Sequence, residues 1–246
     1  MSADINAPLG AWPADMDRDD VHGRHLSVSG SAIVHTSQDE RHVLKVFYSL
    51  AGKNMAPEIT YELRMMLLAG EDISVKVEGR LIVNGELEGF VMPRETTLDL
   101  ALPKTTKRQW IEQLQSLVRR MHNKGIIHGD IKPDNVLIRN GRLILCDFAA
   151  AQLKAEAKQP TEGTTAYQSA WRCRQYDLPL CEADDLYALG VSIWHIWVGR
   201  APFDVDNHGS LDDDIAGGLK PDLDAVDDKA VRGIIEMYLE SAPAAR

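Results

Sequence analysis

The 246-residue sequence predicts an α+β fold with two lobes, a small β-rich lobe containing one helix and a larger, mainly helical lobe. Two observations predict this class. Up to about residue 92, apolar residues occur in short, partly alternating runs that turn residues separate, as is typical of strands. After Pro93 the apolar residues recur at helical spacing over longer segments.

The β-rich lobe is expected to contain short strands and one helix. Asn84 and Gly85 form a two-residue hairpin signal between apolar runs. Pro57 near the first turn and Gly70 just past the last turn delimit the helix. The predicted strands are residues 25–29, 31–36, 43–48 and parts of 73–92, and the predicted helix is 57–69.

The helical lobe begins with a helix that Thr105 or Thr106 could cap and that Gly125 ends. A long stretch with weak periodicity is expected to be an extended loop. The predicted helices are 107–123, 184–198 and 227–240, the strands 136–138 and 143–146, and the loop 150–182.

These elements predict the domain organisation. Residues 1–20 have no helical or strand period and are expected to form a flexible tail. The remainder is expected to be one domain. Its parts are an N-lobe of about 21–92, a hinge of about 93–96 and a C-lobe of about 97–246.

Composition excludes some classes of function. The net charge is −10 and no basic cluster is present, which argues against a nucleic-acid-binding protein. The longest apolar run, residues 189–198, is far shorter than the roughly 20 residues that span a bilayer. Three cysteines without metal-ligand spacing, and no secretory signal at the start, predict an intracellular, cytoplasmic protein.

Two polar motifs lie close together in the helical half. The first contains Asp130, Lys132 and Asn135, and the second contains Asp147 directly after an apolar run. Phosphoryl transfer depends mainly on positioning and charge neutralisation. It requires a carboxylate at the incoming hydroxyl, a lysine at the transferring group, and oxygen ligands for Mg²⁺. The four residues have the types that these roles require.

The two motifs resemble the catalytic loop, H-R-D-x-K-x-x-N, and the metal-binding motif, D-F-G, of eukaryotic-type protein kinases. The resemblance implies that ATP is the phosphoryl donor. Asp130 would be the catalytic base or the group that orients the substrate hydroxyl, and Lys132 would steady the phosphate. Asn135 and Asp147 would bind Mg²⁺. Lysine at position 132 is similar to the Ser/Thr protein kinase form of the loop.

Upstream, Lys45 resembles the strand lysine that contacts the α- and β-phosphates of ATP. The partner that the resemblance requires is a glutamate on the following helix. We expect it to be Glu62, with Glu58, one turn earlier, as the alternative. Glu62 is preferred because Met66 then supplies the apolar contact that packs towards Phe148.

The segment that would cover the nucleotide maps onto residues 27–34. It has no glycine at the three positions where the family has one, and Gly30 is adjacent to one of them. Glycines there allow backbone N–H groups to approach phosphates. The resemblance assigns Ser29, Gly30 and Val34 to the nucleotide site, and we expect low nucleotide affinity or weak catalysis.

The adenine pocket is also assigned by resemblance alone. Val43 and Leu137 would be its apolar roof and floor, and Met92 would border it. Backbone groups near Arg94 would contact the base, because Pro93 has no N–H to donate.

Several residues depart from the family pattern. Gly129 replaces an arginine that reads a phosphate on the activation loop, which predicts either activity without loop phosphorylation or a different switch. Ala149 replaces a glycine, which restricts positive φ at that position. Trp171 replaces a glutamate that normally pairs with an arginine, for which Arg246 is the match.

Other residues keep the pattern. Thr164 matches the threonine that ties the substrate loop to the catalytic residues, and Asp185 matches the helix aspartate that braces the catalytic loop. The C-lobe is shorter than usual after residue 198. Its many aspartates predict a solvated face or, more specifically, a docking surface for a basic substrate segment.

The resemblance covers about residues 24–246 and implies transfer of the ATP γ-phosphoryl group to a Ser or Thr hydroxyl of a protein. Two alternatives stay open. The poor match at residues 27–34, Ala149 and Trp171 favour a pseudokinase that acts as a binding module. The absence of arginine at position 129 also occurs in small-molecule kinases of the superfamily. The sequence does not predict the oligomeric state.

Overall fold

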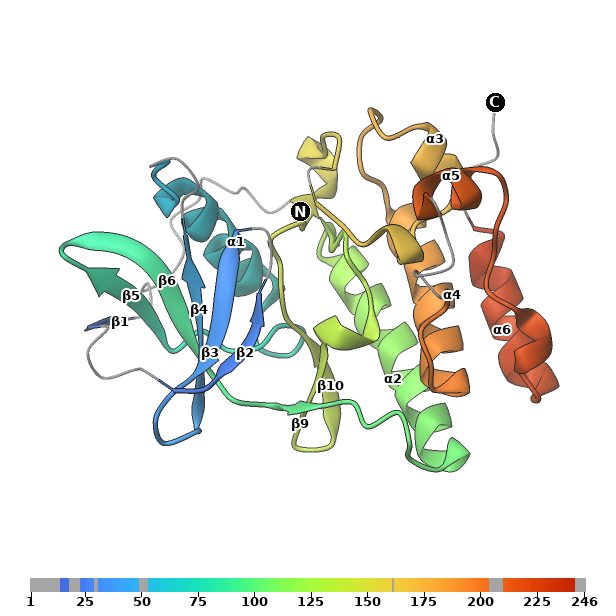
Figure 1. The fold of residues 1–246 in the computed structure, drawn as a ribbon, viewed down its shortest axis with the longest axis horizontal. Coiled ribbons are helices and arrows are strands. Elements are labelled where there is room, and N and C mark those ends of the chain that lie inside the picture. Colours follow the sequence, from blue (N-terminus) through green and yellow to red (C-terminus); the bar gives the residue numbers. More distant parts are fainter. Residues whose placement is uncertain are drawn as a thin grey trace. The chain divides into compact units, whose positions relative to one another are not determined.

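The computed structural model describes residues 14–17, 23–28, 31–48, 53–160, 162–203 and 210–241 (Figure 1). These residues form two compact units. The sheet unit contains the described residues up to Thr96 together with Ile144–Ala149. The helical unit contains Thr97–Leu143 and the described residues from Ala150 onward. A sheet-rich first part and a helical second part confirm the predicted α+β fold class.

A six-stranded sheet dominates the sheet unit, in the order β1-β5-β6-β4-β3-β2. Only the β1–β5 pair in this sheet is parallel. Its strands are β1 (Ala14–Asp17), β2 (His25–Val28), β3 (Ala32–Thr36), β4 (His42–Phe47), β5 (Gly79–Val83) and β6 (Glu86–Pro93). Asn84 and Gly85, both at positive φ, join β5 to β6 in the hairpin that the sequence predicts.

One helix, α1 (Ala56–Ala69), covers part of this sheet and packs against β6. Its apolar residues at helical spacing are buried, and Gly70 (φ 77°) ends it. On the strands, Leu44, Leu81 and Val91 form a buried apolar cluster. Strand and α1 side chains therefore make up much of the core of the sheet unit.

The strand β1 lies within residues 1–20, for which we expected a flexible tail. Ala14–Asp17 instead pairs with β5, and Asp15 forms an ion pair with Arg80 (Oδ1 to Nη2, 2.6 Å). Gly79 makes the pairing possible, because a Cβ there would lie 2.3 Å from the Met16 sulfur. Four residues are too few to show a strand period, so only tertiary pairing reveals this strand.

Helices and short strands make up the helical unit. The helices are α2 (Lys104–Asn123), α3 (Ala170–Arg174), α4 (Glu182–Val198), α5 (Leu211–Ala216) and α6 (Lys229–Leu239), with 3-10 turns η2 (Pro133–Asn135), η3 (Lys154–Glu156), η4 (Thr165–Tyr167) and η6 (Leu223–Ala225). The strands are β8 (Ile126–Ile127), β11 (Gln152–Leu153), β9 (Val136–Arg139), and β7 (Thr96–Thr97) and β10 (Arg142–Leu145) at the borders with the sheet unit. β8 pairs with β11, and the others form a sheet in the order β10-β9-β7.

The helix α4 is the centre of this unit. Most of its side chains are buried, and both α2 and α6 pack against it (Figure 1). Gly199 (φ 82°) ends the helix in a left-handed conformation. Among the described residues, no helix combines the length and the apolar character that crossing a bilayer requires.

Two predictions for this unit were wrong in detail. The helix α2 begins at Lys104, because Pro103 takes the capping position and neither Thr105 nor Thr106 does. Residues 150–182 are not simply an extended loop, since they contain β11, η3, η4 and α3. Each of these elements is too short to show a period in the sequence.

Candidate active site

The carboxylate of Asp130 is held by three neighbours in the helical unit. Its Oδ1 accepts a hydrogen bond from the Thr164 N–H (2.9 Å). Its Oδ2 accepts one from Asn135 Nδ2 (3.0 Å) and lies 2.7 Å from Lys132 Nζ. The side chain is 11% exposed, so the carboxylate is fixed in orientation but still reachable.

The short turn η2 brings these groups together. Pro133 starts the turn, and the Asn135 N–H bonds to the Lys132 carbonyl (3.0 Å). Asn135 Nδ2 also donates to the Asp130 carbonyl (2.8 Å), which leaves its Oδ1 as the oxygen available to a metal ion. Lys132 Nζ donates to Thr164 Oγ1 (2.7 Å). The three motif residues and Thr164 thus form one hydrogen-bonded cluster.

Asp185 on α4 braces the loop that carries Asp130. Its carboxylate, 1% exposed, accepts hydrogen bonds from the N–H groups of His128 and Gly129, both at 2.8 Å. It also bonds His122 Nε2 (2.8 Å). His122 was not singled out in the sequence, where the only signal was a polar residue beside the buried Met121 near the end of a predicted helix. A buried carboxylate with three such partners fixes the loop rigidly.

The loop backbone explains why residue 129 is glycine. Gly129 has φ 79°, and a Cβ there would lie 2.8 Å from the Ala150 carbonyl oxygen and 3.1 Å from Leu180 Cδ2. Side-chain-bearing residues rarely adopt this φ. The structure therefore accommodates no arginine at this position without movement of the neighbouring backbone.

In the sheet unit, Lys45 on β4 lies between two carboxylates. Its Nζ contacts Glu62 Oε1 (2.8 Å) and Oε2 (2.9 Å) on α1, and Asp147 Oδ1 (2.6 Å). Burial alone would lower the pKa of Lys45, but Glu62 and Asp147 outweigh burial and raise it well above its usual value. The structure thus pairs Lys45 with Glu62, whereas Glu58 pairs with the exposed Lys53.

Asp147 itself has an uncommon backbone conformation. Its φ is 60°, and its side chain is 39% exposed, while the next residue, Phe148, is fully buried. Ala149 is not among the residues at positive φ. The replacement of glycine at position 149 therefore produces no strain in this conformation, and the buried Phe148 fixes the segment.

The residues assigned to the nucleotide differ in how deeply they are buried, and two of them are not described. Ser29 and Gly30 lie outside the described residues. In the sheet unit, Val34 and Val43 are partly buried, and Met92 is buried opposite Val43 in the β4–β6 register.

Arg94 and Leu137 are also assigned to the nucleotide site. Arg94 donates its N–H to the Arg41 carbonyl (2.8 Å) and its Nη1 to Glu40 Oε2 (2.7 Å), so both groups have partners other than a base. Leu137, in the helical unit, is partly buried.

The donor set fits Mg²⁺ chemically. No group of three or more His, Cys, Asp or Glu side chains suited to a metal occurs in the described part of the chain. Mg²⁺ needs few protein ligands, because it keeps several waters and takes further oxygens from phosphates. The Asp147 carboxylate in the sheet unit and Asn135 Oδ1 in the helical unit are each an oxygen of the hard type that Mg²⁺ prefers.

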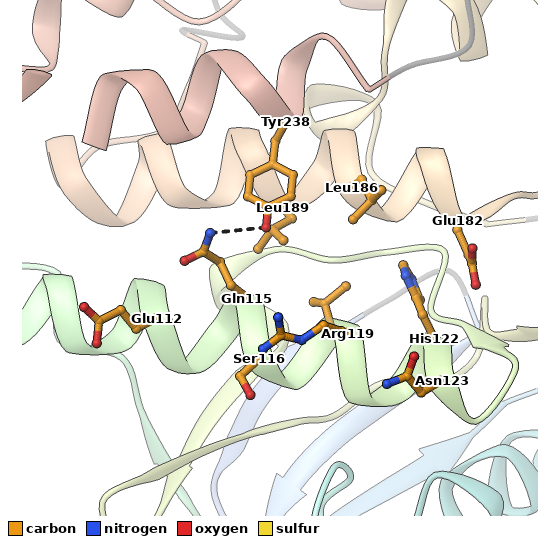
Figure 2. Close-up of a pocket in the computed structure, with 11 residues that line it drawn as sticks. Glu112, Gln115, Ser116, Arg119, His122, Asn123, Glu182, Leu186, Leu189 and Tyr238 are labelled. Carbon is orange, nitrogen blue, oxygen red and sulfur yellow. Dashed lines mark hydrogen bonds between the residues drawn. The ribbon is translucent and has the colours of Figure 1, made fainter. Parts of the chain in front are cut away.

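A cavity of about 420 Å³ lies in the helical unit between α2, α4 and α6 (Figure 2). It contains none of the residues assigned to catalysis. Gln115 on α2 donates to the Tyr238 hydroxyl on α6 (3.2 Å) across it, and His122 lies in its wall. Apart from these three, its lining is Glu112, Ser116, Val118, Arg119, Asn123, Glu182, Leu186 and Leu189.

A sheet unit with a buried Lys–Glu pair, and a helical unit with a braced Asp–Lys–Asn loop, are the features that a protein kinase domain has. The chain matches the protein kinase domain over residues 81–240. It therefore belongs to the protein kinase family.

The similar proteins include Ser/Thr kinases from distant organisms. The chain is 31% identical to serine/threonine-protein kinase RUNKEL of Arabidopsis thaliana over 60% of its own length and 11% of that protein. It is 28% identical to human putative 3-phosphoinositide-dependent protein kinase 2, over 69% of this chain and 44% of that protein. The probable serine/threonine-protein kinase pknA2 of Bifidobacterium longum is 31% identical over 44% of this chain and 14% of that protein. The chain thus matches less than half the length of each of these relatives.

Proposed function

We propose that this chain transfers the γ-phosphoryl group of ATP to a Ser or Thr hydroxyl of a protein, with Mg²⁺ as the metal ion. The observation that carries the proposal is the hydrogen-bonded cluster of Asp130, Lys132, Asn135 and Thr164. We take residues 21–246 as one kinase domain, with residues 93–96 as the connection between its parts.

The helical unit would perform the chemistry. Bound Mg²⁺-ATP would supply the phosphoryl group and neutralise charge that develops on it. Asp130 would accept a hydrogen bond from the acceptor hydroxyl and orient its oxygen, because Thr164 and Asn135 hold the carboxylate in place. Lys132, 20% exposed, would offset negative charge on the transferring group. Asn135 Oδ1 would bind the metal.

The sheet unit would hold the nucleotide. Lys45 would contact the α- and β-phosphates, and Glu62 would keep the lysine in place. Asp147 would exchange its contact with Lys45 for one with Mg²⁺. Val34, Val43 and Met92 would contact the adenine. Arg94 would contribute only its carbonyl, because its N–H already bonds the Arg41 carbonyl.

The connections of Thr164 support a protein acceptor. Thr164 contacts both Asp130 and Lys132, so residues 163–169 lie directly beside the groups that would receive the hydroxyl. Residues 163–166, which are exposed or partly buried, would contact the polypeptide. The exposed aspartates of α5 would favour an acceptor that carries a basic segment.

A pseudokinase is the second candidate. It is favoured by the absence of glycines at three positions of residues 27–34, a feature of the sequence alone. Ala149 does not favour a pseudokinase, since that residue is not at positive φ here.

The test is phosphoryl transfer from γ-labelled ATP to a panel of basic proteins in the presence of Mg²⁺. We expect Asp130→Asn to reduce transfer about a hundredfold to ten-thousandfold, because the hydroxyl loses its orienting carboxylate. Asp134→Asn, an exposed acid in the same loop, is the matched control and should retain transfer. Absence of transfer above the Asp130→Asn background would favour the pseudokinase. Preferential labelling of a metabolite would indicate a small-molecule kinase.

A further inference from the structure

Arg172 on α3 is 3% exposed, and each of its five N–H donors has an acceptor. Nε and Nη2 bond Asp184 Oδ1 (2.8 Å) and Oδ2 (2.6 Å). Nη1 bonds the carbonyls of Gln175 (3.1 Å) and Leu178 (2.8 Å), and Nη2 also bonds the Pro179 carbonyl (3.0 Å). One side chain therefore joins α3, the following loop and α4.

Asp184 completes this connection in the first turn of α4. Its Oδ2 also accepts the N–H of Cys181, the capping residue of the helix (2.9 Å). A bidentate arginine–carboxylate pair is directional as well as strong. Because both charges are buried, removal of either one leaves the other without compensation. The pair therefore fixes one relative position of α3 and α4.

This connection reaches the catalytic cluster through a short stretch of chain. The Arg172 N–H bonds Ser169 Oγ (3.1 Å), and Ser169 follows Thr164, which contacts Asp130, by five residues. Arg172, Asp184, Thr164 and Asp130 all line one small cavity of about 20 Å³. The next residue on α4, Asp185, holds the loop before Asp130. Two adjacent carboxylates of α4 thus support the catalytic cluster. Asp184 holds Arg172, and Asp185 holds the loop before Asp130.

Neither Arg172 nor Asp184 belongs to the family motifs described above. The family ties this segment down through a glutamate at position 171, where this chain has Trp171. The guanidinium of Arg172 lies over the Trp171 ring, 4.8 Å from its centroid. In this chain the residue after Trp171 makes a buried ion pair, with Asp184 on α4.

We propose that Arg172, acting through Asp184, is a positioning residue for the acceptor. It holds residues 163–169 in the position that allows a protein acceptor to lie beside Asp130. The inference rests on the proposed protein kinase function and deepens it. It assigns to this pair the binding of the acceptor polypeptide, as distinct from the binding of ATP.

The test compares Arg172→Lys, which keeps the charge and loses the fork, with Arg174→Lys, an exposed arginine of the same helix. We expect Arg172→Lys to raise the KM for a protein acceptor about tenfold and to change the KM for ATP less than about twofold. Amide hydrogen exchange at residues 163–169 should accelerate about tenfold. Arg174→Lys should leave all three quantities unchanged.

Equal losses for the protein acceptor and for ATP, in step with a lower melting temperature, would overturn the inference in favour of a purely structural role. Unchanged exchange and KM would overturn it as well. If Arg172→Lys fails to fold, Asp184→Asn, which keeps the side-chain shape, provides the same comparison. A parent chain without transferase activity would overturn the proposed function, and exchange at residues 163–169 would still decide whether Arg172 holds the segment.

Discussion

At the scale of single residues, positive φ falls at different positions from those that the family pattern indicates. Gly129 and Asp147 have φ 79° and 60°, whereas Ala149 is not in this region. The glycine that the pattern requires at position 149 is thus dispensable in this conformation. The glycine that stands in place of an arginine, at position 129, is the one that the backbone needs.

This difference predicts a stability effect at Gly129. We expect Gly129→Ala to lower the free energy of unfolding by more than the about 1–2 kcal/mol that left-handed backbone alone costs an L-residue. The excess arises because the added Cβ would meet the Ala150 carbonyl at 2.8 Å. Urea unfolding measures it. The control is Gly125→Ala, at φ 75° with no atom within 4 Å, and equal losses in the two variants would contradict the prediction.

At the scale of elements, the sequence predicted the long segments well. The helix expected at residues 184–198 is α4 (Glu182–Val198), because its apolar residues extend over several turns. The helices α3 and α5, with five and six residues, were missed. So few residues show no period, and tertiary bonds such as those of Arg172 hold α3 in place.

The sequence likewise predicted one residue pair near the candidate site and missed another. Lys45 and Glu62 could be paired from the sequence because the resemblance to the protein kinase family implies this pair, on a predicted strand and a predicted helix. The pair of Arg172 and Asp184 could not be found, since Arg172 lies in a stretch without period. No spacing rule brings residues twelve positions apart together across a loop, so only the folded backbone reveals this contact.

The contact between η4 and α4 predicts a pH dependence of stability. Tyr167 Oη lies 2.7 Å from His195 Nδ1, and burial lowers the pKa of His195 below its usual 6.5, although Asp134 opposes the shift. Between the two pKa values the unfolded chain binds more protons than the folded chain. The stabilisation by neutral His195 is therefore present above pH 6.5 and lost as the pH falls towards the lower, folded-state pKa.

Urea unfolding at about pH 7.5 and about pH 5.5 tests this. We expect the free energy of unfolding of the parent to fall more between these values than that of His195→Gln, which cannot titrate. Glutamine can still bond the Tyr167 hydroxyl, so the variant separates charge from hydrogen bonding. A steeper fall in the variant, or the same fall in both proteins, would contradict the assignment to His195.

At the scale of the whole molecule, each unit contains part of the residues proposed for nucleotide and metal. Lys45, Glu62 and Asp147 belong to the sheet unit, whereas Asn135 belongs to the helical unit. In the proposed function, Mg²⁺-ATP binds the folded chain. A ligand that binds only the folded chain stabilises it in proportion to the logarithm of its concentration.

Mg²⁺-ATP at a hundred times its Kd is accordingly expected to stabilise the chain by about 2.7 kcal/mol, and removal of Mg²⁺ with a chelator should reduce this effect. Asp147→Asn should lose most of the Mg²⁺-dependent part, because a charged oxygen ligand becomes a neutral one. Asp130→Asn should keep the full stabilisation, because that carboxylate is proposed to orient the acceptor and not to hold the nucleotide. Thermal unfolding with ATP alone and with Mg²⁺-ATP separates these contributions. Equal loss of stabilisation in both variants would mean that Asp130 also holds the nucleotide. If Mg²⁺-ATP does not stabilise the parent chain, nucleotide binding itself is weak, as the missing glycines of residues 27–34 predict.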